Sequence, residues 1–169
     1  MRKTFGAAMV AMVLAAQSAM AGEPTPVTLA PIQHTAATLV VKAADGTERS
    51  YTPAELETLP TYSLTTTTPW RDEPAVFEGV LLADILAANG LIDADMIVVT
   101  AENDYATSVE RDLFMGVDIL VATRVNGQPH SRRARGPIQF VIDSETMASN
   151  DLAREGTLVW MAARIEAEG

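Results

Sequence analysis

The chain has 169 residues, of which 12 are Lys or Arg and 22 are Asp or Glu, and its net charge is −10. This acidity argues against nucleic acid or an anionic membrane as the main partner, because the field of the protein would repel both. The chain contains no cysteine. That excludes disulfides, thiolate metal sites, covalent haem attachment, lipobox anchoring and cysteine nucleophiles.

Residues 1–21 have the three parts of a cleavable secretory signal peptide. Arg2 and Lys3 supply the positive region, and the apolar run 5–16 is too short to span a bilayer of ~30 Å. Ala19 and Ala21 place small residues at the cleavage positions. We therefore expect export to the periplasm and no membrane insertion after cleavage. The alternative is an uncleaved membrane anchor.

Cleavage after Ala21 would remove Arg2 and Lys3 and lower Lys+Arg from 12 to 10 against 22 acidic residues, for a net charge of −12. Residues 22–35 contain three prolines and no clear period, so we expect an extended leader. The remaining residues, 36–169, have the length of a single domain.

Apolar and β-branched runs predict the strands of this domain. Asp45-Gly46 and Asn126-Gly127 are tight-turn signals between successive strands. The run 96–101 is apolar almost throughout, which predicts a strand buried on both faces. The expected strands cover 39–41, a stretch ending at Tyr51, and 62–68, 76–80, 96–101, 105–109, 119–125, 138–142 and 158–165.

Three short helices are expected between the strands, over 52–59, 81–89 and 111–115. Thr52 and Glu55 have the spacing of a capping box, and Gly90 suits the C-cap of the second helix. Residues 143–156 are expected to be loop with some helix. Together, the expected strands and helices predict a mixed α+β domain with mostly antiparallel strands. Its core is expected to include Leu82, Ile85, Leu86, Val98, Phe140 and Trp160.

The most unusual local feature is a basic cluster. Arg124, Arg132, Arg133 and Arg135 are four of the ten basic residues that cleavage would leave, and His130 lies among them. Arginine forks suit phosphate and carboxylate groups, and a basic pocket in an acidic protein concentrates anions locally. The cluster predicts an anion site; the alternative is a solvated loop balanced by nearby acids.

Five further residues are candidates for the same pocket. Thr66 and Thr67 belong to the threonine run 65–68, which is either part of the pocket floor or simply a strand. Trp70 beside Arg71 would form a stacking wall for a planar ligand, or belong to the core. Asp104-Tyr105 is either a turn followed by a buried tyrosine or a polar pair that faces the pocket. The two histidines lack metal-ligand spacing, so the residues predict no metal site.

Motifs along most of the domain resemble the sulfite-oxidase-type molybdopterin-binding domain family. The segment 77–86, FEGVLLADIL, resembles the F-x-G-x-x-L-x-x-L-L segment of that family. The ordered set covers about residues 36–166 and includes Asp104-Tyr105, Asp118 to Ala122, Asn126-Gly127, Arg135 to Ile138, and Val159-Trp160 with Ile165. The resemblance implies the α+β molybdopterin-binding fold, with basic and amide groups around a pterin phosphate. Molybdopterin is then the candidate cofactor.

The family's enzymes hold molybdenum through a cysteine thiolate just before a tryptophan. In this chain Thr65 to Thr68 precede Trp70, and threonine stands where the thiolate would be. A hydroxyl is a poor substitute for a soft sulfur ligand. We therefore expect no cysteine-dependent redox catalysis, and we assign no catalytic residue and no metal ligand.

Three hypotheses follow from this pattern. The first is a domain that binds a small anionic or pterin-like ligand or a protein partner. The second is a molybdopterin-dependent oxidoreductase with a non-cysteine metal ligand. The third is an interaction subunit of a membrane sensor or electron-transfer system, with a vestigial pocket.

Overall fold

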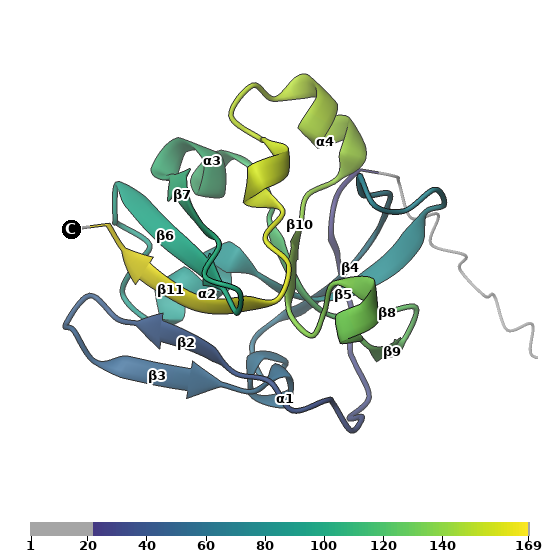
Figure 1. Cartoon of the computed structure of the whole chain (residues 1–169), viewed down its shortest axis with the longest axis horizontal. Coiled ribbons are helices and arrows are strands. Elements are labelled where there is room, and N and C mark those ends of the chain that lie inside the picture. Colours follow the sequence, from purple (N-terminus) through teal and green to yellow (C-terminus); the bar gives the residue numbers. More distant parts are fainter. Residues whose placement is uncertain (1–21, 169) are drawn as a thin grey trace, which may run out of the picture.

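The computed structural model describes residues 22–168, so the predicted signal peptide lies outside the described residues. The described chain forms two β-sheets with short helices around them (Figure 1). The first sheet joins β1 (Thr25–Pro26), β4 (Thr61–Thr66), β5 (Ala75–Leu81), β8 (Leu120–Val125), β9 (Gln128–Pro129) and β10 (Gln139–Val141). The second joins β3 (Glu48–Tyr51), β2 (Leu39–Lys42), β11 (Ala162–Ala167), β6 (Met96–Ala101) and β7 (Ala106–Glu110).

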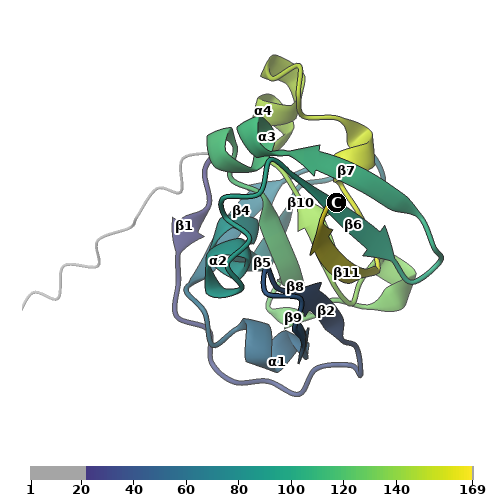
Figure 2. The same ribbon diagram turned by 90° about the vertical axis from the view of Figure 1, so that its left-hand side faces the viewer.

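The strand pairs in residues 22–168 are antiparallel, except that β11 runs parallel to β2. This confirms the expected mixed α+β fold with mostly antiparallel strands. The helices lie at the sheet ends and edges (Figure 2). They are α1 (Pro53–Leu56), α2 (Leu82–Ala88), α3 (Arg111–Gly116) and α4 (Ser144–Ser149). Among the described residues, no helix has the length and apolar character needed to cross a membrane.

The local turn and cap signals are confirmed. The Glu55 backbone N–H donates to Thr52 Oγ1 at 3.2 Å, and the Thr52 backbone N–H donates to Glu55 Oε2 at 2.7 Å, which completes the capping box. Asn126 and Gly127 have φ angles of +52° and +73°, as a tight hairpin turn requires. Gly90 follows α2 with φ +68°, consistent with its expected role at the helix end.

Residues from both sheets and from α2 form one large core. Val41 and Ile165 come from the second sheet, Val121 comes from the first, and Leu82 and Leu86 come from α2. The predicted burial of Leu82, Ile85, Leu86 and Phe140 is confirmed. The shared core holds the two sheets together.

Three burial predictions are wrong: that Val98 is buried, that the strand 96–101 is buried on both faces, and that Trp160 is buried. Val98 is half-buried, because β6 alternates between buried and half-buried positions instead of being buried on both faces. β8 is the strand with that character, since Leu120 to Arg124 are all buried. Trp160 is also half-buried. It precedes β11, at a bend where Met161 has φ +53°.

The leader is bound to the domain along part of its length. β1 pairs with β4, and the Val27 N–H donates to the Thr61 carbonyl at 2.9 Å. The Thr61 hydroxyl donates to the Val27 carbonyl at 2.6 Å. These contacts make residues near the start of the leader an edge of the first sheet.

Replacing Leu86 with alanine is expected to lower the free energy of unfolding by about 2–5 kcal/mol, because the side chain is fully buried between α2 and both sheets. Urea denaturation of the two proteins measures the difference. A loss below ~1 kcal/mol would mean that this helix face does not support the core.

Candidate functional site

A groove lined by arginines and tryptophans lies where the loop between β9 and β10 meets the segment after β4. Its volume is about 310 Å³. We call it the basic groove, and its principal lining residues are Trp70, Arg71, Arg133, Arg135, Gln139 and Trp160. The groove therefore unites the two segments that the sequence predicted as site candidates.

Arg135 is held between the two tryptophans of the chain. Its guanidinium carbon lies 4.3 Å from the Trp70 ring centroid and 5.2 Å from the Trp160 ring centroid. Both distances suit cation–π attraction. A cation–π contact does not use the N–H donors of a guanidinium, so those of Arg135 can still pair with an anion.

The backbone of this loop is shaped to present Arg135. Arg135 ends the 3-10 turn Arg132–Ala134 in the left-handed region, with φ +77°, which is uncommon for a residue other than glycine. Gly136 packs so closely that an added Cβ would lie 2.4 Å from the His130 carbonyl oxygen. Glycine at 136 thus lets the loop fold back on His130.

The arginines of the loop have different surroundings. Arg132 forms a two-point ion pair with Glu102, which fastens the loop to the end of β6. For Arg71, Arg133 and Arg135 there is no ion-pair partner among residues 22–168, and no carboxylate lines the groove. These three positive charges therefore face the groove without neutralisation.

His130 lies buried behind the groove and positions Gln139. The His130 Nε2 is 2.7 Å from Gln139 Oε1, so this ring nitrogen donates and the amide oxygen accepts. The Gln139 amide nitrogen is then the donor left for the groove. Burial lowers the pKa of His130, and the positive charge of Arg71 lowers it further, against the raising effect of the Gln139 hydrogen bond.

We expect stability to fall as the pH drops below 6.5, the ordinary pKa of histidine, toward the lower pKa of folded His130. In this interval the unfolded chain binds the proton and the folded chain does not, so the stabilisation is present above 6.5 and lost below. Denaturation midpoints at several pH values measure this loss. The His130→Gln variant keeps a donor to Gln139 but does not titrate, so it should lose less stability; equal losses would contradict the assignment.

Other predicted site residues lie beside the basic groove. Thr66 is buried, and its Oγ1 accepts from the Ser144 backbone N–H at 2.9 Å, which anchors α4. Thr67 lines an adjoining apolar hollow. Tyr105 lines a neighbouring hollow that shares Trp70 and Trp160 with the groove, and its hydroxyl donates to the Gly156 carbonyl at 3.1 Å.

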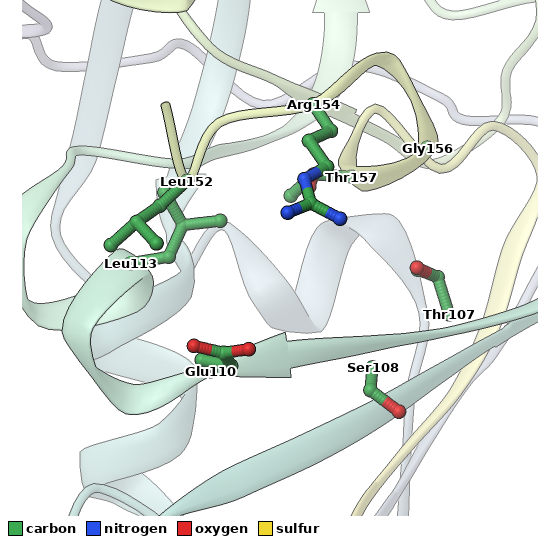
Figure 3. Close-up of a pocket in the computed structure, with 8 residues that line it drawn as sticks. All are labelled: Thr107, Ser108, Glu110, Leu113, Leu152, Arg154, Gly156 and Thr157. Atoms are coloured by element: carbon green, nitrogen blue, oxygen red, sulfur yellow. The ribbon is translucent and has the colours of Figure 1, made fainter. Parts of the chain in front are cut away.

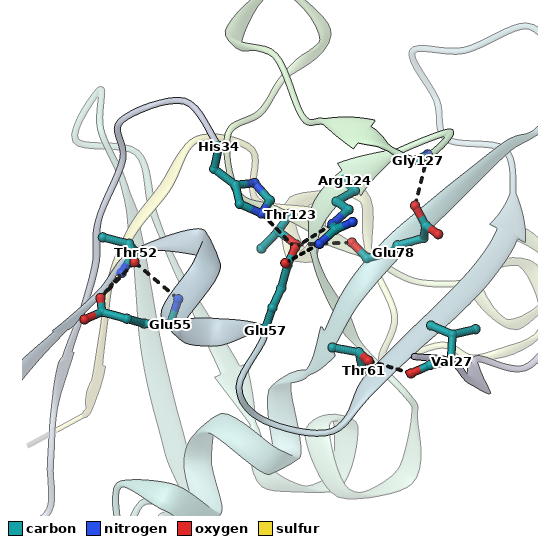
Figure 4. Close-up of polar contacts among 10 residues, drawn as sticks. All are labelled: Val27, His34, Thr52, Glu55, Glu57, Thr61, Glu78, Thr123, Arg124 and Gly127. Carbon is teal, nitrogen blue, oxygen red and sulfur yellow. Dashed lines mark hydrogen bonds and ion pairs between the residues drawn. The ribbon is translucent and has the colours of Figure 1, made fainter. Parts of the chain in front are cut away.

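Arg124 does not belong to the basic cluster. Its guanidinium does not line the groove and forms two hydrogen bonds with Glu57, at 2.9 and 2.6 Å (Figure 4). Thr123 Oγ1 also donates to Glu57, at 2.6 Å. His34 of the leader lies 3.1 Å from Glu57 Oε1, within ion-pair distance although its N–H is not aligned for a hydrogen bond. This buried network has a structural role, because it joins Glu57 to β8 and to the leader.

Another hollow, of about 230 Å³, lies beside β7 (Figure 3). The Arg154 side chain points into it, and Glu110 lines the same space. Because a carboxylate balances the arginine there, this hollow lacks the excess positive charge of the basic groove. The sequence did not predict it.

Sequence reasoning missed Gln139 and Trp160 as lining residues of the basic groove, whereas Thr68 belongs to the threonine run that was a candidate for the pocket floor. Gln139 is the one polar residue in the apolar run 138–142, which was a usable signal for a buried polar group with a specific partner. Trp160 was assigned to a closing strand and expected to be fully buried.

The two sheets define an α+β domain with an arginine-lined groove between loop segments. The family profile described as "Oxidoreductase molybdopterin binding domain" matches residues 24–149, and the chain belongs to this family. No curated protein sequence matches the chain. The profile match confirms the family resemblance seen in the sequence.

A solved structure, the sulfane dehydrogenase SoxCD from Paracoccus pantotrophus, is similar in fold, with a TM-score of 0.58 and 14% sequence identity. The similarity covers 78% of this chain and 38% of that chain. At this identity the likeness shows the fold alone. The chain spans well under half the length of that relative.

The residues around the groove fit only part of the family's cofactor. Arginines and an amide suit a phosphate group. The chain has no cysteine to supply a thiolate ligand, and the threonine run offers hydroxyls, of which Thr66 Oγ1 is engaged with α4. Within residues 22–168 there is also no cluster of His, Cys, Asp or Glu suited to a metal ion. The side chains therefore do not fit the molybdenum end of the cofactor.

Proposed function

We propose that this chain is a binding domain whose basic groove takes an anionic or pterin-like ligand, without cysteine-dependent redox catalysis. The observation that carries the proposal is the convergence of Arg71, Arg133 and Arg135 on a groove that no carboxylate lines. In a chain of net charge −10, three neighbouring arginines without acidic partners concentrate anions at one place.

The chemistry of the groove favours binding over oxo transfer. Sulfane dehydrogenase activity is the property of SoxCD, of which this chain spans 38%. The alternative remains a molybdopterin-dependent oxidoreductase whose metal has an oxygen ligand from the protein. Thr68, which lines the groove, would be the residue to supply that ligand.

Docking of a protein partner is a second candidate function. Trp70, Trp160 and Tyr105 line adjoining hollows beside the arginines. Tryptophan, tyrosine and arginine are the residue types enriched at interface hot spots. This composition supports the role of an interaction subunit for a membrane sensor or electron-transfer system.

The test begins with protein purified from its source cell and analysed for molybdenum and pterin. We expect substoichiometric metal, no oxo-transfer turnover, and calorimetric binding of inorganic pyrophosphate. Stoichiometric molybdenum together with turnover of sulfite or a sulfoxide would establish the oxidoreductase instead. If pyrophosphate and pterin phosphates all fail to bind, the docking function replaces ligand binding.

Export is part of the same proposal, because a periplasmic binding domain must be secreted. We expect the mature protein to begin at Gly22, after the small residues Ala19 and Ala21. N-terminal sequencing of the periplasmic fraction provides the measurement. Retention of Met1 would support the membrane-anchor alternative.

A further inference from the structure

An apolar hollow of about 360 Å³ adjoins the basic groove. It lies between the segment after β4 and the inner side of α4, and we call it the apolar compartment. Pro69, Ile142, Met147 and Leu158 provide its apolar lining. No arginine, lysine or carboxylate lines it, so its chemistry is opposite to that of the groove.

The compartment and the groove meet. Thr68 lines both, so one ligand that passes over this residue reaches the arginines on one side and the apolar side chains on the other. Thr68 is itself buried beneath the junction. The two spaces therefore adjoin at Thr68, with charged residues on one side and apolar residues on the other.

The wall that α4 gives to this site is fixed by hydrogen bonds. Asp143 caps the helix, and its Oδ2 accepts from the Glu145 and Thr146 backbone N–H groups at 2.9 and 3.1 Å. The Ser144 N–H donates to Thr66 Oγ1, which lies two residues before Thr68. These contacts hold Met147 over the compartment while leaving its side chain half-buried, available to a ligand.

We propose that the ligand is a small amphiphilic anion: one sulfonate, phosphate or carboxylate group carried on an apolar body. The anionic group pairs with Arg133 and Arg135, and the apolar body packs against Met147, Ile142 and Leu158. This inference rests on the proposed anion-binding function. It adds that binding free energy comes from both ends, since burial of apolar surface beside a charge pair strengthens binding without further charge.

A homologous series of n-alkyl sulfonates, from methanesulfonate to hexanesulfonate, tests the proposal by calorimetry or ligand-observed NMR. Each added methylene should raise affinity about fourfold until the compartment is filled, because one buried methylene contributes on that scale. Methanesulfonate, which lacks the apolar body, should bind weakest.

Two substitutions separate the ends of the site. Met147→Gln should flatten the chain-length series and leave methanesulfonate binding unchanged. Arg133→Ala should weaken every member by the same factor and keep the slope. The matched control is Met115→Gln on α3, where the methionine is 53% exposed and far from the site in sequence; it should change neither property.

The outcomes distinguish this inference from the function on which it rests. A flat series with methanesulfonate and pyrophosphate still bound overturns the amphiphilic ligand and leaves anion binding in place. A sloped series that Met147→Gln does not flatten also overturns it, because the apolar body would then bind elsewhere. Absence of binding by every sulfonate and by pyrophosphate overturns both.

Discussion

Replacing Glu57 with alanine is expected to lower the free energy of unfolding by about 3–5 kcal/mol. The side chains of Glu57 and Arg124 are only 9% and 4% exposed, so the substitution leaves a buried guanidinium without its partner. It also removes the acceptor of the Thr123 hydroxyl and the carboxylate beside His34. A buried, unpaired charge is among the costliest defects a domain can carry.

The pKa of Glu57 shows the same balance of forces. Burial raises the pKa of its carboxyl group, but the hydrogen bonds from Arg124 and Thr123, together with the nearby His34 ring, outweigh burial and the net shift is downward. The carboxylate therefore contributes stability above its ordinary pKa of 4.5, and this contribution is lost as the pH falls through the lowered value.

Denaturant unfolding of three further variants identifies the cause. Asp93→Ala removes an exposed ion pair with Arg111, in which Asp93 is 89% exposed, and should cost no more than about 1 kcal/mol. The double variant Glu57→Leu with Arg124→Met removes both charges and should recover much of the loss. The loss in free energy of unfolding for Glu57→Gln should lie between those of Asp93→Ala and Glu57→Ala. A Glu57→Ala loss as small as that of Asp93→Ala would show that water reaches Arg124.

The fold could be predicted largely because its signals are local. The Thr52 and Glu55 capping box and the Asn126-Gly127 turn each act within four residues, so the sequence alone contains the interaction. The periodicity of the 81–89 segment likewise identified the buried face of α2. Such features depend little on the rest of the structure.

The site was harder to predict because its grouping depends on contacts across the chain. Arg124 is eight residues from Arg132, yet it pairs with Glu57, 67 residues earlier, because its place on β8 directs the side chain away from the loop. The side chains of the neighbours Thr66 and Thr67 point in different directions, as successive side chains of extended backbone do. Thr66 therefore anchors α4, whereas Thr67 lines the compartment. No local pattern marks these partners.

The position of Trp160 also depends on a contact between segments that are distant in the sequence. The sequence predicts a continuous strand through 158–165, but the backbone bends at Met161, which has φ +53° although it is not glycine. The Met161 N–H donates to the Arg135 carbonyl at 3.2 Å, so the bend follows from packing against the basic loop. The bend brings Trp160 over Arg135, and this tertiary contact has no signature in either segment.

The double variant Arg133→Ala with Arg135→Ala is expected to weaken pyrophosphate binding at least a hundredfold. Each charge-assisted contact contributes about 1.5–3 kcal/mol, and two such losses correspond to two or more decades of affinity at ~1.4 kcal/mol per decade. Calorimetric titration of wild-type and variant protein measures the change. Circular dichroism and the unfolding midpoint establish that the variant is folded.

A charge-matched control separates local contacts from the overall field. Lys42→Ala with Arg49→Ala removes two positive charges from exposed residues on β2 and β3, outside the groove, and should change affinity less than about twofold in physiological salt, where distant charges are screened. If both double variants weaken binding equally, the arginines act only through net charge. If neither does, the loop between β9 and β10 is a solvated loop, and docking of a protein partner becomes the function to pursue.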